Sequence, residues 1–95
     1  MKKTLEKKTK RDIRIVILDR GWVAVGVWSQ HVSGDCRLNN AYIIRTWGTT
    51  AGLGQLALHG PTDSTVLDPI TVIHYDRRNE VANIECYSEK WEQVC

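Results

Sequence analysis

The sequence of 95 residues lacks the patterns that mark membrane insertion, secretion and metal binding. It holds no run of about twenty apolar residues, so we expect no membrane-spanning helix. Its basic start is followed by no apolar segment, so we expect no signal peptide. No Cys-x-x-Cys pair is present, and His31, His59 and His74 lie far apart, with no cysteine or carboxylate at ligand spacing. We therefore predict surface histidines and no metal site.

Patterns typical of enzymes are also missing. No Gly-Lys-Ser/Thr follows the glycine-rich segment, and no dinucleotide-binding pattern is present. A nucleophilic Cys36 or Cys86 acting with His74 has no local support in the sequence. Asp68 and Asp76 are better explained as turn residues than as an acid–base pair. We predict a protein that is not an enzyme and that binds no cofactor.

Three cysteines cannot all pair within one chain. We interpret Cys36, Cys86 and Cys95 as reduced thiols of a cytosolic protein, because disulfides persist mainly in oxidising compartments. Cys86 alternates with apolar residues, so we expect it in the core. Cys95 is the last residue of the sequence, so we expect it to be exposed and able to oxidise between chains.

Positive charge is concentrated at the start of the sequence. Residues 2–11 carry a net charge of +5, whereas the whole chain is +2, so residues 12–95 sum to −3. We divide the chain into a flexible basic tail, residues 1–11, and one small domain, residues 12–95. A body that grips nucleic acid is expected to be basic, so nucleic-acid binding becomes the less favoured function.

Alternation of apolar and polar residues predicts a mainly β domain. We expect five strands, within residues 13–18, 22–30, 36–47, 64–76 and 80–88, and one short helix over residues 51–59 between the third and fourth strands. Asn39 and Asn40 indicate an irregularity in the third strand, and Pro69 interrupts the fourth. Trp91 is expected to fold back over an open end. These elements favour a small, strongly bent antiparallel sheet or a partly open barrel of the SH3-like or Sm-like kind.

The second predicted strand has two different faces. Three valines share one face and form the expected core side. The other face holds two large rings around two small residues, which would form a shallow saddle: Trp22, Ala24, Gly26 and Trp28. We predict that this saddle is an interface with another copy or a partner, since exposed apolar patches mark association surfaces. A stacking platform for nucleic-acid bases ranks behind core packing and an interface.

The most informative stretch is Arg45–Thr62, where glycines and threonines surround a tryptophan. Backbone N–H groups at a helix start can bind an anion, and Trp47 could stack on a ring. Alternatively, the glycines only allow the short helix to lie flat against the barrel. Both interpretations stay open. The candidate ligand or partner site comprises Arg45, Trp47, Gly48, Thr49, Thr50, Gly52 and Gly54.

The same stretch resembles a family of small uncharacterised proteins of tailed bacteriophages and prophages. The shared pattern is W-G-x-x-x-G-L-x-Q-L-A-x-x-G, which runs here from Trp47 to Gly60. The opening "IVILDRGWVAVGVW" also fits that family's first hairpin. The likeness covers residues 13–91 and is most specific over residues 41–69. "TWGTT" is less aromatic than in the family, and the lysine-rich tail is not typical of it. The family carries no known activity, so the resemblance implies a phage setting and no mechanism.

These observations lead to one preferred function and two alternatives. The preferred one is a non-enzymatic phage accessory protein in the host cytoplasm, which binds a host protein or a small anionic molecule and inhibits host defence. A homo-oligomer is expected, and no membrane association. The alternatives are a nucleic-acid-binding module that uses the tail and the tryptophans, and a minor virion or assembly component.

Overall fold

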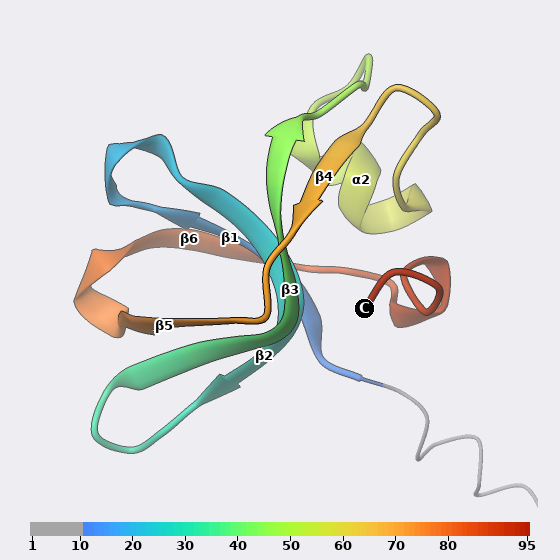
Figure 1. Cartoon of the computed structure of the whole chain (residues 1–95). Coiled ribbons are helices and arrows are strands. Elements are labelled where there is room, and N and C mark those ends of the chain that lie inside the picture. The colour runs from blue at the N-terminus through green and yellow to red at the C-terminus, as the bar shows by residue number, and fades with distance from the viewer. Residues whose placement is uncertain (1–10) are drawn as a thin grey trace, which may run out of the picture.

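The computed structural model describes residues 11–95, so the flexible tail predicted for residues 1–11 lies outside the described residues except for Arg11. The described chain forms a bent antiparallel sheet with one short α-helix (Figure 1). No helix in residues 11–95 has the length and apolar character needed to cross a membrane. The elements are β1 (Ile13–Leu18), η1 (Asp19–Gly21), β2 (Val23–Gln30), β3 (Asp35–Thr46), α2 (Leu53–His59), β4 (Val66–Pro69), β5 (Val72–Asp76), η2 (Arg77–Asn79), β6 (Glu80–Glu85) and η3 (Ser88–Lys90).

The sheet is organised around β3. Its strand order is β4-β3-β2-β1-β6, and β5 pairs with β3 as well. The first half of β3 pairs with β5 and the second half with β4. Between them, the N–H of Ile70 donates to the carbonyl of Ala41 at 2.9 Å, which holds the corner against β3. The predicted fourth strand is therefore two strands, and the sheet has six in place of five. The expected bent antiparallel sheet is confirmed.

The bend has a visible cause in β2 and β3. Their register shifts between Val25 and Val27, and Asn40 adopts a left-handed conformation with φ of 51°. A Cβ atom on Gly26 would lie 2.8 Å from the carbonyl oxygen of Asn39, so only glycine lets β3 approach this closely. The irregularity predicted at Asn39 and Asn40 is confirmed. After it, odd-numbered residues of β3 replace even-numbered ones on the same face of the sheet.

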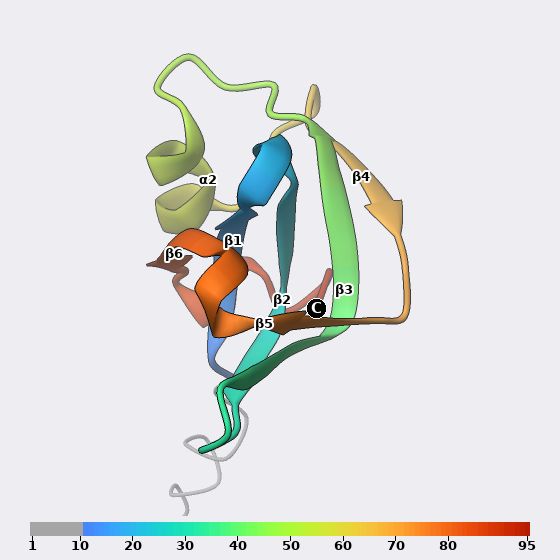
Figure 2. The ribbon, with the colours of Figure 1, turned by 90° about the vertical axis from the view of Figure 1, so that its left-hand side faces the viewer.

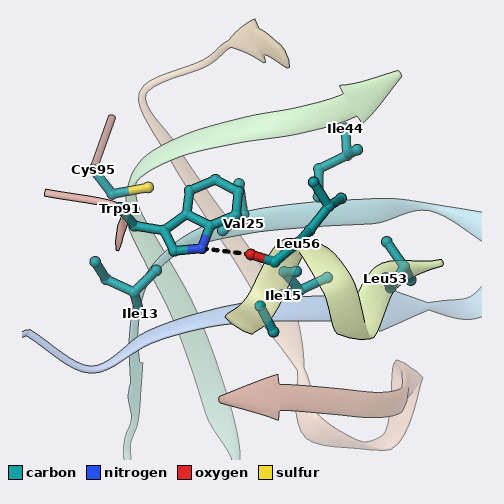
Figure 3. Close-up of a cluster of buried hydrophobic side chains, with 9 residues drawn as sticks. Ile13, Ile15, Val25, Ile44, Leu53, Leu56, Trp91 and Cys95 are labelled. Carbon is teal, nitrogen blue, oxygen red and sulfur yellow. Dashed lines mark hydrogen bonds between the residues drawn. The ribbon is translucent and has the colours of Figure 1, made fainter. Parts of the chain in front are cut away.

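Two apolar clusters lie on opposite sides of β1 and β2. The first lies between the sheet and α2 (Figure 3), and Figure 2 shows α2 on one side of the β1–β2 pair. It comprises Ile13, Ile15, Val25, Ile44, Leu53, Leu56, Ala57, Trp91 and Cys95. The second comprises Val16, Ala24, Cys36, Leu38, Ala41 and Tyr75. Both faces of β1 are thus buried, as its sequence pattern indicated.

Trp91 anchors the C-terminal segment in the first cluster. Its ring is fully buried, and its indole N–H donates to the carbonyl of Leu56 at 3.0 Å (Figure 3). The expected return of Trp91 onto the domain is confirmed, and it fastens α2 to the end of the chain.

We predict that Trp91→Ala destabilises the domain by about 3–5 kcal/mol, because the change removes a large buried ring and leaves a cavity. Denaturant unfolding followed by circular dichroism measures the loss. Trp47→Ala is the matched control, since Trp47 is 42% exposed and should cost far less. Equal losses for the two variants would show that Trp91 does not anchor the core.

Candidate binding surfaces

Three backbone amides of the Gly/Thr segment, those of Thr50, Ala51 and Gly52, already have acceptors. The amides of Thr50 and Ala51 donate to Oε1 of Gln55 at 3.2 and 2.9 Å. The amide of Gly52 donates to Oγ1 of Thr49 at 3.0 Å. These donors are therefore not available to an anion unless the loop rearranges. Sequence reasoning missed Gln55, which acts here as the internal acceptor.

The glycine at position 48 serves close packing. A Cβ atom on Gly48, whose φ is 67°, would lie 2.6 Å from the backbone nitrogen of Thr65. Thr62 Oγ1 donates to the carbonyl of Gly48 at 2.7 Å, and Thr65 Oγ1 donates to that of Trp47 at 2.8 Å. Of the two interpretations of this segment, the geometry favours packing of the chain against its own backbone.

Arg45 is paired across β3 and β4. Its guanidinium makes two hydrogen bonds of 2.9 Å to the carboxylate of Asp68, and these hold the pKa of Asp68 below its usual range. Asp68 thus lies on a strand with a charged partner, and was predicted to be a turn residue. Gly54 faces open space on the exposed side of α2. That these residues bind a ligand stays a prediction, and Arg45, Trp47 and Thr50 are the exposed side chains among them.

The predicted saddle faces the chain's own interior. Ala24 and Gly26 are buried, and Trp28 is half-buried against the second cluster. Trp22 is the well-exposed member, at 58%. Because both faces of β2 are apolar, its sequence could not indicate which one faces outward. An interface at these four residues stays a prediction, and at the surface of a single chain it would rest on Trp22.

A ring of polar contacts connects four strands at one end of the domain. The indole N–H of Trp28 donates to the hydroxyl of Tyr75 at 3.0 Å, and that hydroxyl donates to Glu80 at 2.7 Å. The other oxygen of Glu80 accepts from Asn83, whose own oxygen accepts from Arg14 at 2.9 Å. The guanidinium of Arg14 lies 3.9 Å from the centre of the Trp28 ring, which closes the ring of contacts.

This polar ring joins β5 to β6, which share no ladder of backbone hydrogen bonds in the described chain. Burial first, and then the bond to Glu80, raise the pKa of Tyr75 well above its usual value, so its hydroxyl stays a donor. A hydrogen bond to Asp12 raises the pKa of Arg14 further, so its charge is permanent. No local pattern in the sequence pointed to this ring, because its members are spread from Arg14 to Asn83.

Two strand edges lack a pairing partner within residues 11–95. β6 pairs with β1 alone, and β4 and β5 pair with β3 alone. The N–H of Cys86 donates toward β1 at 2.9 Å, so by alternation the amides of Asn83 and Glu85 point away from it. The N–H of Arg77 donates to Gly34 at 2.9 Å, so the amide of His74 points outward in the same way. Each edge therefore has outward backbone N–H groups without a strand partner in residues 11–95.

The expectation for Cys95 is wrong. The residue is 4% exposed, because the last turn of the chain packs with Trp91 in the first cluster. Burial raises the pKa of Cys95 to about 11 and that of Cys86 to about 12, and it also raises the pKa of Cys36. All three cysteines are unpaired thiols in the described structure, and Cys86 packs against the first cluster, as expected. Across residues 11–95, no group of three or more metal-binding side chains gathers at one point.

We predict that Tyr75→Phe costs about 1–3 kcal/mol of stability, because it leaves the indole N–H of Trp28 and a carboxylate oxygen of Glu80 without their partner. Thermal or denaturant unfolding measures the change. Tyr87→Phe is the matched control, since Tyr87 is exposed and has no such contacts. A Tyr75→Phe protein as stable as the control would mean that the polar ring does not hold the seam between β5 and β6.

We also predict slow alkylation of the native thiols. At about pH 8, groups with raised pKa values hold little thiolate, and thiolate is the reactive form. Iodoacetamide labelling followed by intact-mass spectrometry should be slow for the folded protein and fast in guanidinium chloride. Rapid labelling of Cys95 in the folded protein would contradict its burial.

A comparison with solved structures agrees with this architecture, whereas two comparisons of sequence found no match. No family model and no curated protein matches the chain. Among solved structures, a heptameric archaeal Sm protein, described for its implications for the eukaryotic snRNP core, is similar to it with a TM-score of 0.52. The two are 11% identical, and the match covers 87% of this chain and 97% of the Sm protein. The fold is therefore Sm-like, as one of the sequence-based expectations held.

Proposed function

We propose that this protein acts by binding and not by catalysis, and that it assembles with copies of itself through its unpaired strand edges. The observation that carries the proposal is the pair of unlike edges, β6 on one side and β4–β5 on the other. A row of outward N–H and C=O groups is a template for another strand. Joining unlike edges head to tail generates a ring when the rotation closes.

The side chains along these edges favour association. Val81 on β6 is 67% exposed, and Val72 on β5 is also exposed. Charges or proline discourage pairing at a strand edge, and Pro69 stands at the end of β4, so on that side the proposed contact is made by β5. The Sm protein of similar fold is a heptamer, which supports assembly for a fold of this kind.

We further propose the setting of a phage or prophage accessory protein, on the basis of the Trp47–Gly60 motif. In that role an assembled ring would present several copies of one surface to a host protein or a small molecule, and would inhibit a host defence inside the infected cell. Repeated presentation raises the apparent affinity for a partner with several sites.

Nucleic-acid binding is the second candidate, and the charge of the body weighs against it. The first ten residues hold five lysines and one glutamate, which leaves eight of the thirteen basic and ten of the eleven acidic residues for residues 11–95. The described body is thus slightly acidic, whereas phosphate backbones are held by basic surfaces. A nucleic-acid binder should copurify with nucleic acid at low salt and release it at high salt.

The direct test changes one edge residue. Val81→Lys places a charge on the β6 edge without disturbing the core, so the assembly should dissociate while the fold is kept. Light scattering coupled to size exclusion measures the mass. We expect wild type to be oligomeric at micromolar concentrations and Val81→Lys to be a monomer with an unchanged circular dichroism spectrum.

Val32→Lys is the matched control. Val32 lies in the turn between β2 and β3 and is 99% exposed, so the same chemical change occurs away from both edges. This variant should keep the wild-type mass. A monomeric wild type, or an oligomer that survives Val81→Lys, would refute assembly through this edge.

A further inference from the structure

An apolar cavity of about 350 Å³ opens beside the second cluster. It lies between the end of the β1–β2 hairpin, which contributes Leu18 and Trp22, and β5. Its lining comprises Leu18, Trp22, Ala24, Ile43, Ile70, Ile73, His74 and Tyr75. Ala24 is fully buried, whereas the side chains of Leu18 and Trp22 remain partly open to solvent.

The cavity exists because a small residue stands where a large one would fill the space. Ala24 lies opposite Ile43 in the β2–β3 ladder. The bent sheet therefore leaves a hollow, partly open to solvent, that the side chains of residues 11–95 do not fill, whereas protein interiors are otherwise closely packed.

The lining selects an occupant without charge. Among residues 11–95, no Lys, Arg, Asp or Glu lines the cavity. The hydroxyl of Tyr75 is held between Trp28 and Glu80, so it is not offered to a guest. A charged group placed here would lose its hydration with no compensating partner. Apolar atoms, by contrast, gain free energy on leaving water.

The volume separates a small molecule from a polypeptide. Ligand pockets measure roughly 300–1,000 Å³, and this cavity lies near the lower bound. A helix, with a diameter of about 10–12 Å, is too wide for it. We propose that the cavity is a binding site for a small, uncharged aromatic or branched aliphatic molecule, with Trp22 as the ring that covers it at the rim. The site is formed by one chain, so it does not depend on assembly.

Phenylnaphthylamine, a neutral dye that fluoresces in apolar surroundings, is the probe. We expect saturable binding of one dye per chain to the full-length protein. Trp22→Ala should weaken the affinity roughly five-fold through loss of a ring contact. Tyr87→Ala, which removes an equally exposed aromatic side chain outside the cavity, should leave it unchanged. The sulfonated analogue, anilinonaphthalene sulfonate, should bind more weakly, since no Lys or Arg of residues 11–95 lines the cavity to pair with the sulfonate.

The Val81→Lys variant separates this proposal from the one on assembly. It should bind the neutral dye as wild type does, whatever its oligomeric state. Dye binding that appears only in that variant would overturn the proposal, because a second copy would then fill the cavity in wild type. Absence of saturable binding, equal losses for Trp22→Ala and Tyr87→Ala, or tighter binding of the sulfonated dye would also overturn it.

Discussion

The close approach of β3 to β2 at Gly26 is the contact on which the rest of the structure depends. A side chain there would collide with the backbone at Asn39, so the two strands could not stay paired through the bend. The strands do stay paired, and at Asn40 the alternation of side chains in β3 shifts by one residue. β3 then supplies apolar residues to both clusters. The bend also gives β3 two successive partners, β5 before it and β4 after it.

The binding features follow from that bend. A strand shared by two partners leaves β4 and β5 with one unpaired edge, and β6 ends the sheet on the other side. The seam between β5 and β6 is closed by side chains, through Tyr75 and Glu80, and not by a ladder. Where the sheet curves around Ala24, this small side chain leaves space unfilled, and that space is the apolar cavity. The unpaired strand edges and the cavity are therefore two consequences of one backbone geometry.

Local pattern predicted the elements better than their environment. Alternation of apolar and polar residues located β1, β2, β3 and β6. The short helix begins at Leu53, two residues later than expected, because Gln55 accepts hydrogen bonds from the preceding amides and holds them in a loop. Pro69 indicated an interruption between β4 and β5. That the interruption is a full corner, with two separate strands, depends on the hydrogen bond from Ile70 to Ala41, which lies far away in the sequence. With apolar residues on both faces of β2, nothing local assigns Trp22 or Trp28 to a side. Sequence reasoning also missed the polar ring, because its residues are far apart in the sequence and meet only in the folded chain.

Hydrogen exchange of the outward amides tests the central claim, that unlike strand edges pair between copies. The amides of Asn83 and Glu85 on β6 and of His74 on β5 have no partner in the described chain, so in a monomer they should exchange at nearly unprotected rates. We expect these three amides to be protected at concentrations where the protein is assembled and to lose protection together on dilution. Unprotected exchange of these three amides in an assembled protein would contradict pairing through these edges.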